Sequence, residues 1–306
     1  MKHFILMVLM AGTAISTAQA GQLQTPDIRT TIDDSSSTVR YPWGIAVDAG
    51  GNIHVADKSF ATVRIYAPFG DTYADAGVVA DDHIISQPVG LALDSTGNMF
   101  VSEATAVAVF ARQTAGGFAA PTLLGQSVVS TPYGVAVGAT GDVFVADPTH
   151  TAVRWFSPSG SGYVQNVDIL PSSSARFDYD VAVDGLGTVF VADTFAHKIQ
   201  IFHISAGAYP STPDATLDMG SGTAYGVNLD RYGNIYVADH DGLRIVRFVN
   251  DGNGNYSPPS VVASNFSMTP NRVAVDRMLN VYVTTANAYA GTVIRIGDRL
   301  FGDGFD

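Results

Sequence analysis

The stretch Tyr225–Phe248, Y-G-V-N-L-D-R-Y-G-N-I-Y-V-A-D-H-D-G-L-R-I-V-R-F, is the unit from which the rest of the chain is built. A glycine opens a short apolar run that ends at Asp230, and a Gly233-Asn234 turn follows. A second apolar run ends at Asp239, and a third follows a polar loop. Two runs joined by a glycine-bearing turn predict a β-hairpin, and the third run extends the hairpin into a meander.

The same unit occurs six times. Its opening residue recurs at steps of 46, 44, 46, 46 and 46, at Gly44, Gly90, Gly134, Asp180, Gly226 and Arg272. The acid that closes the second run recurs at Asp57, Glu103, Asp147, Asp193 and Asp239, with Thr285 in the sixth copy. A fixed period in the mid-forties, with about four short strands per copy, is typical of a propeller blade. The sequence therefore predicts an all-β, six-bladed β-propeller of four-stranded antiparallel blades.

Two segments carry a resemblance to a known family. Residues 41–57 read Y-P-W-G-I-A-V-D-A-G-G-N-I-H-V-A-D, and residues 189–202 read V-F-V-A-D-T-F-A-H-K-I-Q-I-F. Both resemble the repeats of NHL-type propellers, and the resemblance covers roughly residues 41–297. It implies the same six-bladed architecture.

The amino-terminal region has two expected roles. Residues 1–20 resemble a secretory signal peptide, with Lys2 before an apolar core and Ala18-Gln19-Ala20 as a small-residue cleavage site. Because the sixth copy lacks a fourth run, we expect Asp27–Ile32 to complete that blade and close the ring, which would otherwise leave a bare sheet edge. The propeller would then occupy residues 21–298, and 299–306 would form a tail.

Composition narrows the possible partners. The chain has no cysteine, and 15 basic and 28 acidic residues remain after residue 20, a net charge of about −13. Nucleic-acid binding draws on clustered Lys and Arg, so we expect no nucleic-acid partner. The apolar stretch within 1–20 is short for a membrane span, so we expect none. An exported protein, periplasmic or extracellular in a Gram-negative bacterium, is the resulting expectation.

The residues at the first-strand openings predict a binding site. In a propeller, the loops that enter the first strands gather at one mouth of the central channel, where ligands usually bind. The residues before the six opening positions are Trp43, Val89, Tyr133, Tyr179, Tyr225 and Asn271. Four aromatic rings form a possible platform for a glycan, a peptide or a protein. The alternative is that these rings only plug the channel.

Two blades replace the opening glycine with a charged residue. These are Asp180 in blade four and Arg272 in blade six, and both charges are expected at the same mouth. Because the two blades are not neighbours in the ring, the sequence does not imply a direct salt bridge between them, and the alternative is that both are solvated loop charges.

Other polar residues indicate structure more than chemistry. The acids at strand ends are expected to accept backbone N–H bonds and hold the loops. His150, His197 and His240 lie in loops at the mouth, but at different offsets from their acids, which argues against a shared zinc site. The sequence therefore indicates no catalytic residue, metal ligand set or cofactor. Binding at the mouth is the main interpretation; a metal-dependent hydrolase or lyase at the same mouth and a structural envelope-assembly module are the alternatives.

Overall fold

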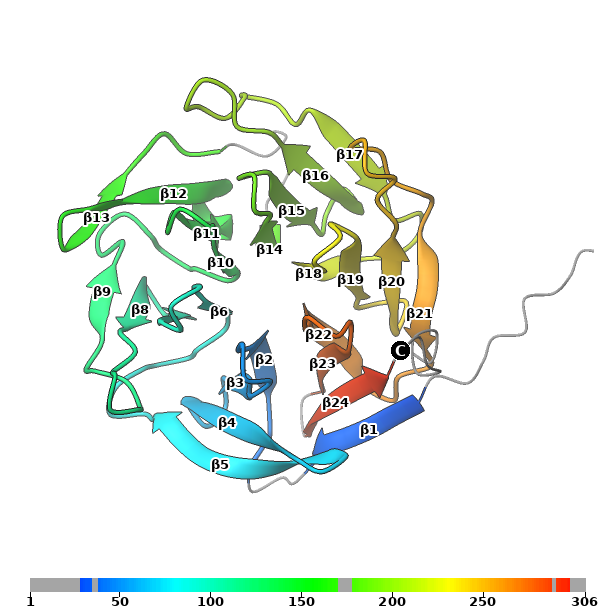
Figure 1. The fold of residues 1–306 in the computed structure, drawn as a ribbon. Helices are drawn as coiled ribbons and strands as arrows, with labels where there is room; N and C mark the ends of the chain where they lie inside the picture. The colour runs from blue at the N-terminus through cyan, green and yellow to red at the C-terminus, as the bar shows by residue number, and fades with distance from the viewer. Residues whose placement is uncertain (1–27, 35–37, 170–177, 288–289, 298–306) are drawn as a thin grey trace, which may run out of the picture.

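The computed structural model describes residues 28–34, 38–169, 178–287 and 290–297. Within these residues, 24 strands form six four-stranded antiparallel sheets arranged as blades around a central axis (Figure 1). The described part also contains a 3-10 helix, η1 (Pro148–His150). No helix in the described part is long and apolar enough to cross a membrane. The expected signal peptide and tail lie outside the described residues.

Each blade begins at the axis and proceeds outward in chain order, except that the outermost strand of blade six is β1. Blades one to three consist of β2 (Pro42–Val47), β3 (Ile53–Asp57), β4 (Thr62–Phe69), β5 (Thr72–Ala80); β6 (Leu91–Leu93), β7 (Met99–Glu103), β8 (Ala106–Phe110), β9 (Thr122–Leu124); and β10 (Val135–Val137), β11 (Val143–Asp147), β12 (Ala152–Ser159), β13 (Gly162–Gln165). Blades four to six consist of β14 (Asp178–Val183), β15 (Val189–Asp193), β16 (Lys198–Phe202), β17 (Ala215–Asp218); β18 (Ala224–Leu229), β19 (Ile235–Asp239), β20 (Arg244–Phe248), β21 (Ser260–Ser264); and β22 (Thr269–Val275), β23 (Val281–Ala286), β24 (Gly291–Gly297), β1 (Ile28–Asp33).

Strand β1 closes the ring, as the sequence predicts. It pairs antiparallel with β24, from Ile28 opposite Gly297 to Asp33 opposite Val293. Its side chains also reach both neighbouring blades. The Arg29 guanidinium lies 4.2 Å from the centroid of the Phe266 ring beyond blade five. Tyr66 of blade one donates a hydrogen bond of 2.7 Å to Asp33. The closing strand therefore covers the edge of β24 and links blades five and one.

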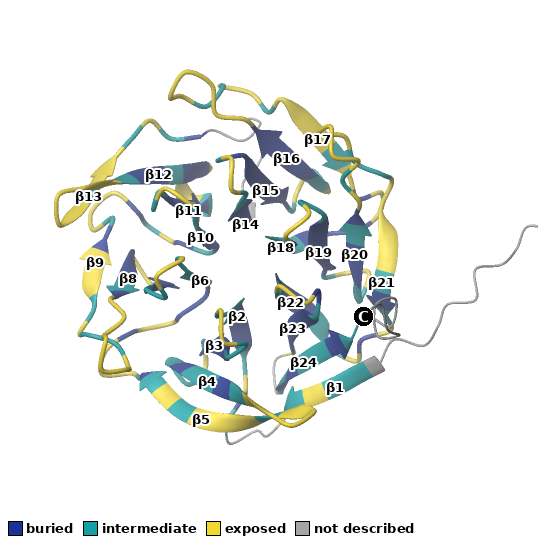
Figure 2. Cartoon of the chain, in the orientation of Figure 1, coloured by how far each residue is buried: buried dark blue, intermediate teal, exposed yellow. Residues whose placement is uncertain are grey.

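Burial follows the blade geometry. The second strands are buried nearly throughout, whereas outer strands such as β5 and β17 are largely exposed (Figure 2). The second strand places one valine at the same buried position in every blade, at Val55, Val101, Val145, Val191, Val237 and Val283. These valines occupy the space between blades and account for much of the repeat pattern.

An aromatic ring from each of five blades packs on the preceding blade. These rings follow the outer hairpin turns, and their centroids lie 5.8–6.4 Å from the ring of a second-strand residue, with planes 83–90° apart. The pairs are Tyr73–Tyr282, Phe118–His54, Tyr163–Phe100, Tyr209–Phe144 and Tyr256–Phe190. Edge-to-face pairs add stability beyond the area they bury. The Tyr236 ring of blade five has Arg247 5.9 Å over it, and this arginine is its cross-strand partner in the same blade.

Candidate functional site: the channel mouth

The opening glycines bring the first strands together at the mouth. A Cβ atom at Gly90 would lie 2.1 Å from the carbonyl oxygen of Tyr133, and one at Gly134 would lie 2.6 Å from the Cα of Asp180. Each glycine therefore allows the next blade to approach its backbone closely. As a result, the residues just before these positions converge on the axis.

Trp43 forms the centre of the mouth. Its ring centroid lies 5.3 Å from that of Tyr133, at 51°, and 6.1 Å from that of Tyr41. The side chain is 6% exposed, whereas Tyr133 and Tyr41 are half-buried. The carbonyl of Trp43 also accepts a 2.8 Å hydrogen bond from Thr284. The indole of Trp43 is thus held in place by packing, and the two half-buried tyrosines lie beside it.

Asp180 and Arg272 meet at this mouth. The Nε atom of Arg272 lies 3.3 Å from Oδ2 of Asp180, and both side chains are buried. The sequence did not imply this salt bridge, and the alternative that both residues are solvated loop charges is wrong. Blade five lies between them, but near the axis the first strands are close, and an arginine side chain is long enough to reach across one.

Blade five takes part in the same network. Asp180 accepts a 3.0 Å hydrogen bond from the backbone N–H of Val227, and Arg272 donates a 2.6 Å hydrogen bond to the carbonyl of Tyr225. Burial raises the pKa of the Asp180 carboxyl, while Arg272 and the backbone N–H of Val227 oppose that shift. The Arg272 guanidinium also lies 5.4 Å from the Trp43 ring centroid. Blades four, five, six and one are thereby joined at the mouth.

The remaining predicted residues take different positions. Tyr225 is half-buried and stacks on His240 with ring centroids 4.0 Å apart. Asn271 is buried and donates a 3.1 Å hydrogen bond to the carbonyl of Pro42. The side chain of Tyr179 lies outside the described residues. Trp43, Tyr133, Asp180 and Arg272 therefore come together, Tyr225 adjoins them through its carbonyl, and Asn271 ties blade six to blade one.

Sequence reasoning missed Lys58 as a mouth residue. Its Nζ atom lies 5.4 Å from the Trp43 ring centroid, and its backbone N–H donates a 3.0 Å hydrogen bond to the carbonyl of Tyr41. A signal was present in the sequence, because Lys58 directly follows the recurrent strand-end acid Asp57 and is one of two lysines after residue 20. Lys58 is half-buried, so part of this cation remains open to solvent.

The axial cavity lies below the mouth. It has a volume of about 220 Å³ and is lined by the later residues of the first strands, from Ile45–Val47 in blade one to Ala274–Val275 in blade six. Neither Trp43 nor Arg272 lines it. The cavity is therefore lined by residues that lie farther along the first strands than the mouth positions do.

The strand-end acids hold loops, as predicted. Asp57 accepts hydrogen bonds from the backbone N–H groups of Arg40 and Tyr41 at 2.7 and 3.0 Å. Asp239 accepts one from Thr223 at 2.8 Å, and Asp193 one from Ala196 at 2.8 Å. These carboxylates fix the loops that carry the mouth residues.

The mouth histidines are engaged separately. The Nδ1 atom of His150 lies 2.7 Å from Asp147, that of His197 lies 2.8 Å from the carbonyl of Gly222, and that of His240 lies 2.8 Å from Asp241. The three imidazoles do not share a partner.

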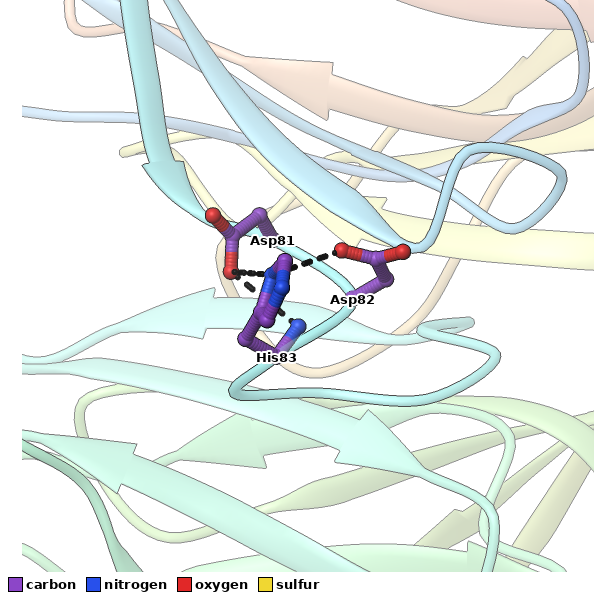
Figure 3. A group of neighbouring side chains, drawn as sticks. All are labelled: Asp81, Asp82 and His83. Atoms are coloured by element: carbon purple, nitrogen blue, oxygen red, sulfur yellow. Dashed lines mark hydrogen bonds and ion pairs between the residues drawn. The ribbon is translucent and has the colours of Figure 1, made fainter.

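A group of potential metal ligands occurs elsewhere in the described residues. Asp81, Asp82 and His83 are consecutive, follow β5 and lie in the loop between blades one and two (Figure 3). Their ligand atoms all lie within 4.8 Å of one another, and Nδ1 of His83 is 2.9 Å from Asp82. All three belong to one exposed turn.

Solved structures share this architecture. A gluconolactonase from Xanthomonas campestris matches with a TM-score of 0.64 at 16% identity, covering 89% of this chain and 90% of its own. A carbohydrate-active enzyme of family AA12 from Trichoderma reesei matches with a TM-score of 0.64 at 13% identity, covering 88% and 95%. Virginiamycin B lyase from Staphylococcus aureus matches with a TM-score of 0.57 at 10% identity, covering 87% and 98%.

The chain is a six-bladed β-propeller. At these identities the likeness concerns the fold alone. No family model matches the chain, and no curated protein matches it in sequence.

Proposed function

We propose that this chain is an exported, NHL-type propeller that binds a ligand or a protein partner at its mouth. The observation that carries the proposal is the packing around Trp43. Its ring lies 5.3 Å from Tyr133, 5.4 Å from Lys58 and 5.4 Å from Arg272. Because the buried Arg272–Asp180 pair holds this group from below, the surface is preorganised, and a ligand would order few side chains on binding.

The chemistry of the surface suggests the class of ligand. Tyr133 and Tyr225 are half-buried rings that combine an apolar face with a hydroxyl, which suits sugars and extended peptides. Among the described residues, Lys58 forms no ion pair with a carboxylate, whereas Arg272 is paired with Asp180. Ligands with a carboxylate beside a flat or apolar group, such as acidic glycans or acidic peptides, therefore fit best.

Catalysis at the same mouth is the second candidate. It is favoured by the functions of the proteins that share the fold, which include a lyase and a gluconolactonase. The geometry gives it less support, because His150, His197 and His240 each contact a different local group. A purely structural envelope module, the third candidate, would require no ligand at all. The signal-like residues 1–20 support export under all three.

A fluorescence screen tests the proposal. Neutral and acidic glycans and extended peptides are titrated into the protein while tryptophan emission is recorded. We expect saturable changes with acidic ligands, and an affinity about tenfold lower in Tyr133→Ala and Lys58→Ala. Phe69→Ala, which replaces an exposed aromatic residue at the end of β4, is the matched control and should bind as the parent does. Equal affinity in all three variants would contradict the proposal.

A metal measurement separates binding from metal-dependent catalysis. The purified protein is incubated with zinc or calcium, desalted and analysed for bound metal. We expect less than one bound ion per chain. A stoichiometric ion lost in His150→Ala or His240→Ala would favour the hydrolase or lyase. Absence of any ligand together with a loss of envelope integrity in a deletion strain would favour the structural module.

A further inference from the structure

Three neighbouring blades expose large apolar side chains at one turn position. The turns between first and second strands lie at the face opposite the mouth, and their third residues are Gly50, Thr96, Thr140, Leu186, Tyr232 and Met278. Leu186 is 86% exposed, Tyr232 58% and Met278 82%. The first strands of blades four, five and six are consecutive around the axis (Figure 1). We refer to Leu186, Tyr232 and Met278 as the turn-face arc.

The fold does not require these side chains. In each of the three arc turns an aspartate accepts a hydrogen bond from the backbone N–H of the third residue, and the distance is 2.8 Å for Leu186, Tyr232 and Met278 alike. Thr96 of blade two makes the same 2.8 Å bond without an apolar side chain. The turns are therefore held by their backbone and their aspartates. Large apolar groups left in water on one side of a ring are typical of an interaction site.

Two arginines flank the arc. Arg231 and Arg277 occupy the second turn position in blades five and six, where the other blades have Ala49, Ser95, Ala139 and Gly185. The Arg231 guanidinium lies 4.7 Å from the Tyr232 ring centroid and donates a 2.6 Å hydrogen bond to its hydroxyl. Within the described residues, neither arginine forms an ion pair with a carboxylate. Asp184, Asp230 and Asp276 of the same turns are half-buried or buried and accept hydrogen bonds within their own turns, so the two arginines are the exposed charges of the arc.

The arc also borders the axial cavity. The lining residues nearest the turns are Val183, Leu229 and Val275, each directly before the aspartate of an arc turn. The lining residues are aliphatic apart from Asn228 of blade five. The axial cavity has a volume of about 220 Å³, which is enough for one large side chain. A partner on the arc could therefore place a side chain at the axis.

We propose that the turn-face arc docks an acidic peptide segment of a partner protein. Its apolar side chains would cover Leu186, Tyr232 and Met278, and its carboxylates would pair with Arg231 and Arg277. A peptide with one or two carboxylates matches the two arginines, whereas the many phosphates of an anionic bilayer or a nucleic acid would be repelled by the net negative charge of the chain. The site is distinct from the mouth, since the two lie at opposite ends of the first strands.

A selection with displayed peptides tests the proposal. A random twelve-residue library is selected on the parent protein, with counter-selection on Leu186→Ser/Tyr232→Ser/Met278→Ser. We expect enriched peptides that combine Asp or Glu with Phe, Leu or Trp. A fluorescein-labelled copy of the most enriched peptide is then measured by anisotropy. Its affinity should fall about tenfold or more in the triple variant.

Matched variants make the outcome specific. Arg231→Ala/Arg277→Ala should weaken the peptide several-fold and reduce the dependence of its affinity on salt. Thr96→Ala/Thr140→Ala, at the equivalent turns, and Tyr133→Ala, at the mouth, should leave it unchanged. All substituted turn residues are exposed, so we expect each turn variant to melt at the same temperature as the parent protein, and calorimetry checks this.

Three results would overturn the proposal. One is a selection that enriches no acidic, apolar peptides. Another is that the parent protein binds phosphatidylglycerol vesicles but no peptide, and that the triple variant loses the vesicle binding. This result would assign the arc to a lipid surface. A third is concentration-dependent dimerisation lost in the triple variant, which would assign it to a second copy of the chain.

Discussion

Removal of Arg272 should strongly destabilise the propeller. Its side chain is 5% exposed and that of Asp180 is 9% exposed, so Arg272→Met would leave a buried carboxylate without its cation. Loss of one partner from a buried ion pair costs about 3–5 kcal/mol in the free energy of unfolding. Asp180→Asn should cost a similar amount, because it leaves the guanidinium buried. The double variant should cost less than the two single losses together, by a coupling free energy of about 2 kcal/mol.

Urea unfolding followed by tryptophan emission measures these values at pH 7 and pH 4.5. Burial raises the pKa of Asp180, and loss of Arg272 removes a group that opposes this shift. A raised pKa in the folded state means that protonation favours folding, so this contribution weakens as pH rises through the folded-state value. Arg272→Met should therefore differ less from the parent at pH 4.5 than at pH 7.

The exposed Arg277 provides a matched control on the turn of the same blade, and Arg277→Met should unfold as the parent does. Losses below about 1 kcal/mol for both single variants, or strictly additive losses in the double variant, would refute the account of the mouth as a structure held by this pair.

Three further predictions concern closure, loops and tyrosines. Deletion of residues 28–33 exposes the edge of β24 and removes the Asp33–Tyr66 bond, so aggregation or a marked fall in melting temperature is expected by light scattering and calorimetry; unchanged melting would contradict closure by β1. Asp193→Asn should lower stability but leave the ligand affinity of the folded protein near parental, and loss of a bound metal with normal melting would contradict a structural role. Burial raises the pKa of Tyr256 to about 12, and burial with hydrogen bonds to Tyr73 and Asp276 raises that of Tyr282 further. A tyrosine with a raised folded-state pKa contributes stability that is lost as pH rises above about 10, its pKa in the unfolded state. Unfolding in this pH range should therefore accompany the late part of the tyrosine titration, followed by absorbance at 295 nm.

The repeat made the architecture predictable. Glycine at positions such as Gly90 and Gly134 reflects a packing constraint that recurs in each blade, so the sequence period reports the geometry directly. Closure by β1 was also predictable, because the sixth copy lacks a strand and residues near 27–32 have suitable composition. Its observed bounds are one residue later than expected.

The site was less predictable because it depends on side-chain reach. The Arg272–Asp180 contact passes over a first strand of blade five, and counting blades around the ring gives no measure of distances near the axis. Lys58 was missed because its loop position does not recur as lysine in other blades. The arc residues Leu186, Tyr232 and Met278 are visible in an alignment of the six turns, but their exposure requires the structure.

Trp43 offers the most direct test of binding at the mouth. Trp155→Phe leaves Trp43 as the single tryptophan; the replaced indole packs on Phe144 in blade three, away from the mouth. Because Trp43 is 6% exposed, a ligand would be sensed through its contacts with Lys58 and Tyr133, which lie against the indole. For the ligand found in the screen, the account predicts a saturable change in Trp43 emission with the same Kd as calorimetry gives. Calorimetric binding with unchanged Trp43 emission would contradict it and place the site elsewhere on the propeller.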